Sequence, residues 1–158
     1  MNNKRILTFL TVISLLAVLS TTAYTATGAH AATPTLVGTW YVTIPKSETN
    51  PQPGQAIVTF FADGNMIEMN AFSNPAMTKP GHGVWIASGN TYLLAFDLFT
   101  FDDKGKNTAR IRTHLSIKMD GRDHWNATST AELIDLAGKM TKLPPGSSDG
   151  TRMKVEMP

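Results

Sequence analysis

The chain has 158 residues, with 14 Lys and Arg against 12 Asp and Glu, and it contains no cysteine. This length permits one domain with a short tail, and the lack of cysteine excludes a disulfide scaffold and any thiolate-based metal or nucleophile chemistry. Apolar residues make up 42% of the chain and charged residues 16%, a balance that excludes an intrinsically disordered protein.

The first 31 residues have the features of an export signal. Lys4 and Arg5 precede an apolar run of 14 residues from Ile6 to Leu19, and a small, polar stretch then ends in Ala29-His30-Ala31. This order is typical of a signal peptide with an A-x-A cleavage site. The run is shorter than the ~20 apolar residues that a membrane span needs. We therefore predict a signal peptide over residues 1–31, a mature domain over 32–158 with no membrane span, and a secreted or periplasmic protein.

Cleavage would also change the charge of the protein. Without Lys4 and Arg5, the remaining residues hold 12 basic and 12 acidic side chains. A neutral chain lacks the basic surface that binds phosphate backbones, so nucleic acid is not an expected partner.

The mature chain shows no sustained helical periodicity, and turn-forming residues recur along it, as in an all-β meander. We predict an all-β fold, an eight-stranded antiparallel up-and-down barrel, whose closure removes exposed sheet edges. A barrel of this size is either just filled or holds one small ligand. The expected strands are 36–44, 55–62, 65–71, 82–88, 91–101, 107–119, 124–135 and 150–157, with longer loops at 45–55, 73–81 and 142–149.

Two hairpins allow a prediction of strand register, because cross-strand partners share a face. A two-residue turn at Asp63-Gly64 pairs Phe60 with Ile67 on one face and Thr59 with Glu68 on the other. A three-residue turn at 120–122 pairs Ile117 with Trp125, and Arg110 with Glu132 outside. The inner face of the long strands would then mix small with large residues, which predicts a modest cavity: Ala109, Thr113, Ala127, Ser129 and Ala131 beside Ile111, Leu115, Ile117 and Trp125.

Gly38-Thr39-Trp40, on the first expected strand, resembles the Gly-x-Trp signature of lipocalins and related calycin barrels. The resemblance implies that Trp40 closes one end of a barrel and that a basic residue near the last strand, here Arg152, packs on it. The segment Pro80 to Trp85 is similar to the Pro-Gly-His-Gly-x-Trp segment of small secreted bacterial barrels of unassigned function. Allene oxide cyclase and the spirotetronate cyclases have comparable barrels, so the fold leaves binding and catalysis both open.

A His–Asp pair is the main candidate for chemistry. A two-residue turn at Gly89-Asn90 pairs His82 with Asp97. Such a pair could orient an imidazole for general acid or base catalysis, anchor a ligand, or only join two strands by a hydrogen bond.

The face that this pair occupies depends on the next turn. If Asp103-Lys104-Gly105 is a three-residue loop with Gly105 as a bulge, Asp97 pairs with Ile111, Phe99 pairs with Ala109, and the His–Asp pair points inward. If the register is one residue longer, Trp85, Leu94 and Phe96 point inward and the pair lies outside. We favour the first register, because a bulge of this type needs a left-handed residue where Gly105 stands.

The other signals are weaker. His114 and His124 are expected to face outward, so a three-histidine metal site is not predicted, and no metal or cofactor motif is present. Residues 91–99 are apolar on both faces, which predicts a homo-oligomer through the outer face of strand 91–101. In the favoured register that outer face carries Tyr92, Leu94, Phe96 and Leu98, with Arg112 across from Phe96 and able to stack on it.

These observations predict a barrel that binds a small, largely apolar ligand in its interior. The expected ligand-binding residues are Trp40, Phe60, Phe99, Thr113, Trp125 and Ser129, and His82 and Asp97 supply further polar contacts. The alternative is an isomerase or cyclase that acts on a small hydrophobic substrate in the same cavity, with His82 and Asp97 as its catalytic residues. A third possibility is a ligandless barrel that acts through its outer face. Catalysis therefore stays undecided at this point.

Overall fold

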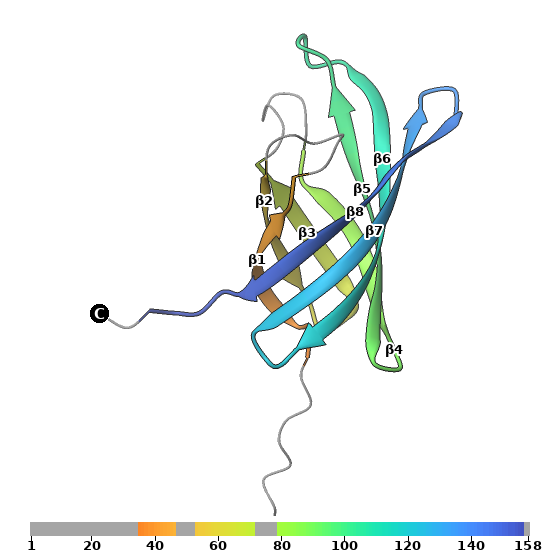
Figure 1. Ribbon diagram of the computed structural model, residues 1–158. Helices are drawn as coiled ribbons and strands as arrows, with labels where there is room; N and C mark the ends of the chain where they lie inside the picture. The colour runs from red at the N-terminus through yellow and green to blue at the C-terminus, as the bar shows by residue number, and fades with distance from the viewer. Residues whose placement is uncertain (1–34, 47–52, 72–78, 157–158) are drawn as a thin grey trace, which may run out of the picture. The chain divides into compact units, whose positions relative to one another are not determined.

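The computed structural model describes residues 35–46, 53–71 and 79–156. The chain divides into two compact units, 1–33 and 34–158, and the first, with the expected signal peptide, lies outside the described residues. The second unit contains eight strands and, among its described residues, no helix (Figure 1). The strands are β1 (Gly38–Ile44), β2 (Gly54–Phe60), β3 (Asn65–Asn70), β4 (Gly81–Ser88), β5 (Thr91–Phe101), β6 (Asn107–Asp120), β7 (His124–Asp135) and β8 (Met140–Arg152).

The strands form a closed antiparallel barrel in which each strand pairs with its neighbour in sequence and β8 pairs with β1. This confirms the predicted all-β, up-and-down barrel. The β1–β8 joint is short, from Trp40–Arg152 to Thr43–Asp149, whereas the β5–β6 and β7–β8 hairpins project past the other strands at one end (Figure 1). We call this the wide end, and the opposite end, where residues 35–37 lead into β1, the narrow end.

Side chains alternate between the barrel interior and the solvent, as strand geometry requires. The core packs around the narrow end, where the largest fully buried side chains are Leu36, Trp40, Phe60 and Ile117. Other core residues come from several strands and include Val42, Ala56, Val58, Met66, Leu94, Trp125 and Ala127.

The last strand differs from the prediction of a loop over 142–149 and a strand over 150–157. Strand β8 begins at Met140 and includes Pro144 and Pro145. These prolines lie at a bulge, because Ser129 pairs with Gly146 while Ala131 pairs with Leu143. They also lie outside the segment that pairs with β1. Proline lacks a backbone donor and is tolerated at bulges and strand edges, which is why a Pro-Gly-Ser-rich segment can be a strand here.

The favoured register between β5 and β6 is wrong, although the predicted turn is present. The Asp102 amide donates to the Lys106 carbonyl at 3.0 Å, and Gly105 has a φ of 77°. A bulge between Thr100 and Phe101 then shifts the ladder by one residue. Its extra residue is Thr108, whose hydroxyl lies 2.9 Å from that of Thr100. The alternative register is therefore the observed one, with Asp97 opposite Arg112 instead of Ile111, and Phe99 opposite Arg110 instead of Ala109.

The β2–β3 register also differs by one residue. The Phe61 amide donates to the Asn65 carbonyl at 3.0 Å, so the turn holds three residues instead of two. Phe60 pairs with Met66 and Val58 with Glu68. Because a slip of one residue exchanges the two faces of a strand, Glu68 points into the barrel and not outward.

The β6–β7 register differs by two residues, which leaves each residue on its predicted face. Ile117 pairs with Ala127 rather than Trp125, and Arg112, not Arg110, stands opposite Glu132. The β4–β5 register is as predicted, with His82 opposite Asp97.

Candidate functional site

A cavity of about 120 Å³ lies inside the barrel. Its wall is mostly aliphatic and aromatic, with one carboxyl group and a few hydroxyl groups. Small side chains on β2, β7 and β8 leave room opposite the larger ones, as the predicted mixture of small and large residues requires. The lining residues are Val42, Ile44, Ala56, Val58, Phe60, Met66, Glu68, Leu94, Phe96, Thr113, Leu115, Ile117, Trp125, Ser129, Gly146, Ser147 and Ser148.

The narrow end is closed by Trp40, which is fully buried. Its indole nitrogen donates to the Leu36 carbonyl at 2.8 Å, and its ring lies 6.1 Å from that of Trp125. The guanidinium of Arg152 stacks on the Trp40 ring at 4.1 Å from its centroid. This is the contact that the lipocalin resemblance implied. Trp40 and Arg152 together close the barrel below the cavity.

The contact between Arg152 and Trp40 requires a glycine at position 38. Gly38 has a φ of 129°, and a Cβ at this position would lie 2.6 Å from Nη1 of Arg152. A side chain would therefore displace the guanidinium from Trp40. The Gly-x-Trp sequence thus has a physical basis here: the glycine admits the arginine that covers the tryptophan two residues later.

Glu68 is the one carboxyl group in the cavity wall. Only 6% of the residue is exposed, and its Oε2 is buried without a hydrogen-bond partner. Burial raises the pKa of Glu68 above its ordinary value of 4.5, while hydrogen bonds from the Asn70 side chain and the Gly81 backbone partly oppose this change. Burial of a charge without a cation is costly, so this position disfavours the ionised form of Glu68.

Two glycines of β4 let the neighbouring side chains lie against bare backbone. A Cβ on Gly81 would lie 2.9 Å from Oε2 of Glu68 and 2.8 Å from the Phe96 ring. A Cβ on Gly83 would collide with the Ala95 carbonyl oxygen and with Phe96. The Phe96 ring therefore covers bare backbone, and the Gly-x-Gly spacing of the Pro80–Trp85 segment has a packing origin.

Trp85, at the end of the same segment, contributes to the barrel and not to the cavity wall. Its indole nitrogen donates to the carbonyls of Phe61 and Asn65, both at 3.1 Å. Its ring packs edge-on against Phe60 at 6.2 Å. Trp85 thereby holds the β2–β3 turn in the conformation that points Glu68 inward.

The cavity also contains an unpaired donor. The indole nitrogen of Trp125 is buried and has no hydrogen-bond partner, and the ring lies flat on Gly150, where any side chain would collide with it. Thr113, Ser129, Ser147 and Ser148 add hydroxyl groups to the wall. An apolar cavity with a few directed polar groups is typical of a small-molecule site.

Most of the predicted ligand-binding residues are in this wall. Phe60, Thr113, Trp125 and Ser129 line the cavity, and Trp40 packs beneath it against Trp125. Phe99 is the exception and corrects the prediction, because 51% of it is exposed. The bulge at Thr108 places it on the outer face, opposite Arg110.

The His82–Asp97 pair lies on the outer face, which contradicts the favoured inward placement. Asp97 accepts hydrogen bonds from Arg112 at 2.8 Å and from Arg110 at 2.6 Å. The bond from Arg112, followed by the charges of both arginines, holds the pKa of Asp97 below its usual range. His82 is exposed, and none of the hydrogen bonds found among the described residues joins it to Asp97.

The apolar strand β5 is explained by the barrel itself. Tyr92, Leu94, Phe96 and Leu98 were expected on an outer, covered face, but Leu94 and Phe96 line the cavity and Leu98 is buried. Arg112 bonds to Asp97 and does not stack on Phe96. Self-association through the outer face of residues 91–101 stays a prediction, with Leu93 and Phe99 as its exposed apolar side chains.

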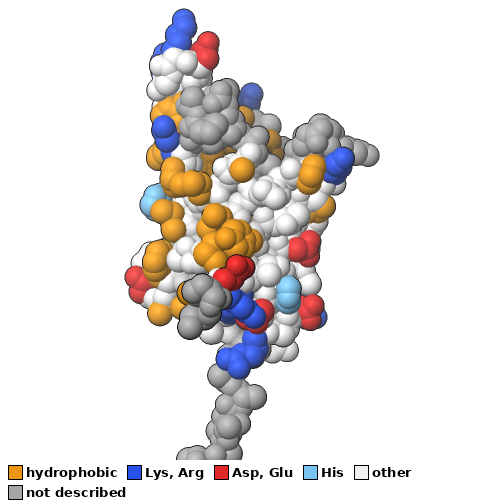
Figure 2. Space-filling model, turned by 90° about the vertical axis from the view of Figure 1, so that its left-hand side faces the viewer, with side chains coloured by type: hydrophobic (Ala, Val, Ile, Leu, Met, Phe, Trp, Pro, Cys, Tyr) orange, Lys and Arg blue, Asp and Glu red, His pale blue; other side chains and the backbone are white. Residues whose placement is uncertain are grey.

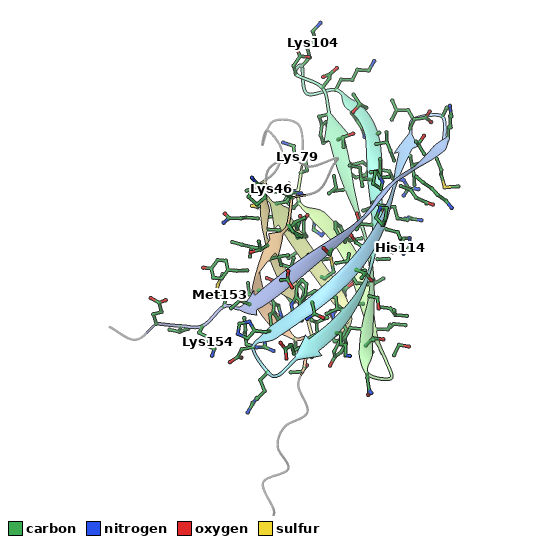
Figure 3. The ribbon with its side chains drawn as sticks, viewed as in Figure 1. Lys46, Lys79, Lys104, His114, Met153 and Lys154 are labelled. Carbon is green, nitrogen blue, oxygen red and sulfur yellow. The ribbon has the colours of Figure 1, made fainter. Side chains whose placement is uncertain are left out.

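The outer surface carries a second apolar area, on β1, β2 and β3. Tyr41, Ile57 and Met69 are exposed there and border a shallow groove, and Figure 2 shows hydrophobic side chains gathered on this side of the barrel. Lys46 and Lys79 lie at the wide end of the barrel, and Lys154 lies near the narrow end (Figure 3).

Among the described residues there is no helix that could cross a membrane, and no group of three or more His, Asp or Glu side chains that could hold a metal ion. No protein-family model, curated protein or solved structure matches this chain.

Proposed function

We propose that this protein is a lipocalin-like binding protein that holds a small, largely apolar molecule inside its barrel. The observation that carries the proposal is the cavity itself, which is closed below by Trp40 and Arg152 and lined by Phe60, Phe96 and Trp125. Burial of apolar ligand surface against such a wall contributes about 25 cal/mol per Å², and the hydroxyl groups fix the orientation of the ligand.

The size of the cavity limits the ligand. A dry protein cavity of about 150 Å³ holds benzene, and the volume here is about 120 Å³. The ligand part that enters the barrel is therefore of the order of a single ring. A long acyl chain would not fit without displacing side chains of the core.

The alternative, an isomerase or cyclase in the same cavity, has less support. That hypothesis requires His82 to be the acid or base. In the structure His82 is exposed and lies on the outer face together with Asp97. A group that moves a substrate proton must reach the substrate, and a side chain on the outer face does not reach the cavity. The proposal therefore concerns binding.

The proposed place of action is outside the cytoplasm, in the periplasm or the medium. Lys4 and Arg5, the apolar run 6–19 and Ala29-His30-Ala31 support this location. A secreted barrel with an apolar cavity would collect or carry a small molecule.

The experiment is to fill the cavity and measure binding of an apolar probe. Toluene is titrated into the purified protein, and binding is followed by NMR or calorimetry. Ser129→Leu adds two heavy atoms to the cavity wall, so we expect it to weaken toluene binding at least about tenfold, which corresponds to about 1.4 kcal/mol. Thr128→Leu is the matched control, because Thr128 precedes Ser129 on β7 and is exposed. Equal binding by both variants, or no binding by the wild type, would remove the proposal.

A further inference from the structure

The cavity holds an acid and no base. Glu68 is the only titratable side chain in its wall, and the causes of its raised pKa include no neighbouring charge. Its Oε2 has no hydrogen-bond partner. Buried polar atoms are normally paired, so an unpaired carboxyl oxygen on a residue that lines the cavity points to a partner supplied by a ligand.

The polar and apolar parts of the cavity lie at different levels of the barrel. Glu68 stands opposite Gly81, the first residue of β4, and so lies toward the wide end. Trp125 is the second residue of β7, pairs with Gly150 and packs on Trp40 at the narrow end. A ligand would therefore place its apolar body on Trp125 and its polar group beside Glu68.

We infer that the ligand is a small ring compound that carries a protonated amine, whose N–H groups donate to the carboxylate of Glu68. This inference rests on the proposed function and names the class of ligand. A carboxylate is an acceptor that pairs best with a charged donor. The Phe96 ring lies against Gly81 beside Glu68 and lines the same wall, and an aromatic ring attracts a cation rather than an anion.

The charged groups around Glu68 agree with this choice. The neighbouring strands contribute Val58 from β2 and Gly81 from β4, and the opposite wall from β5 to β8 contributes no charged side chain. Lys46 and Lys79 are the lysines closest to Glu68 in the sequence, and both lie at the wide end of the barrel (Figure 3). Both are exposed, and Lys79 lies over the Phe101 ring, 5.7 Å from its centroid. Solvent screens such charges, so they do not replace a cation at Glu68.

Four probes of nearly equal size test the inference: toluene, benzyl alcohol, benzylamine and benzoate. Each is titrated into the purified protein and into Glu68→Gln, which keeps the size of the side chain and removes its charge. At pH 8 we expect benzylamine to bind the wild type at least about tenfold tighter than benzyl alcohol, because hydrogen bonds to charged groups are the strong ones. Glu68→Gln should lose this preference, so that benzylamine and benzyl alcohol bind it with similar affinity.

The possible failures are distinguishable. If toluene binds but benzylamine has no preference, the amine inference is wrong and the proposed function stands. If benzoate binds best, an anion is recognised, by the lysines of the wide end, and the inference is again wrong. If none of the four probes binds, the proposed function falls and the inference falls with it.

A measurement on the wild type covers the case in which Glu68→Gln does not fold. Ionisation of Glu68 is required for the ion pair, so the affinity for benzylamine should rise as the pH rises through the pKa of Glu68, up to the pKa of the amine. The affinity for toluene should not rise in this way, because an uncharged probe gains nothing from ionisation. A parallel pH dependence of the two probes would overturn the inference.

Discussion

Arg152, on the last strand, lies 4.1 Å from the centroid of the Trp40 ring on the first strand, and it also donates to the Val37 carbonyl at 2.7 Å and the Thr35 carbonyl at 2.6 Å. One guanidinium thus joins residues 35–37, β1 and β8 at the point where the barrel closes. A lysine could not make these contacts together, since it has one point charge instead of a planar fork of donors.

This arrangement predicts that Arg152→Ala lowers the free energy of unfolding by about 2 kcal/mol, through loss of the cation–π contact and of the hydrogen bonds to the Thr35 and Val37 carbonyls. Arg152→Lys should recover less than half of the loss. Urea denaturation followed by tryptophan fluorescence measures both. A change below about 0.5 kcal/mol for Arg152→Ala would mean that the contact does not stabilise the closure.

Glu68→Gln should stabilise the protein at neutral pH. Because burial raises the pKa of Glu68 in the folded state, folded protein binds more protons than unfolded protein, and wild-type stability falls as the pH rises above the ordinary value of 4.5. The glutamine variant lacks this dependence. The stability difference should be small at pH 4, grow with pH and become constant above the raised pKa. Thermal melts of both proteins across pH 4–8 would show it, and a constant difference over that range would contradict it.

Gly81→Ala and Gly83→Ala should differ in severity. At Gly81 the new methyl group meets the ends of the Glu68 and Phe96 side chains, which can move into the cavity, so we expect a loss of about 1–3 kcal/mol and weaker binding of toluene. At Gly83 the methyl group meets the Ala95 carbonyl of the adjacent strand, which cannot move without breaking the sheet. Gly83→Ala should therefore have the lower Tm, and the reverse order would show that the backbone adapts more easily than the side chains.

Asp97→Asn should have little effect on binding. Asp97 and its two arginines are partly exposed on the outer face, and exposed ion pairs contribute at most about 1 kcal/mol. Because the pKa of Asp97 is lowered, its contribution to stability is present above the ordinary value of 3.8 and is lost as the pH falls through the lowered value. Toluene affinity should stay within about twofold of the wild type. A larger loss in Asp97→Asn or His82→Ala would return these residues to the list of functional candidates.

The β5–β6 and β7–β8 turns share one sequence pattern, which predicts a hairpin at each place. Asp102 and Asp135 each precede a three-residue turn that ends in glycine and is followed by lysine, at Gly105 and Gly138. In both turns the aspartate accepts from the amides two and four residues later, at 2.8–3.0 Å. Comparison of the two segments would have predicted the β7–β8 hairpin and the start of β8 near Met140, in spite of the two prolines.

The sequence alone determined the all-β class, the number of strands, the positions of the first seven and the pairing of His82 with Asp97, because turn residues and apolar alternation are local signals. Only the tertiary structure decided which face of β3, β4 and β5 points inward. Side chains alternate with a period of two, so one extra residue at the Asp63–Gly64 turn or at Thr108 exchanges the inside and outside of a strand. Because of those two extra residues Glu68 points into the cavity and Asp97 points out of it, so the candidate site is a buried acid and not the His82–Asp97 pair.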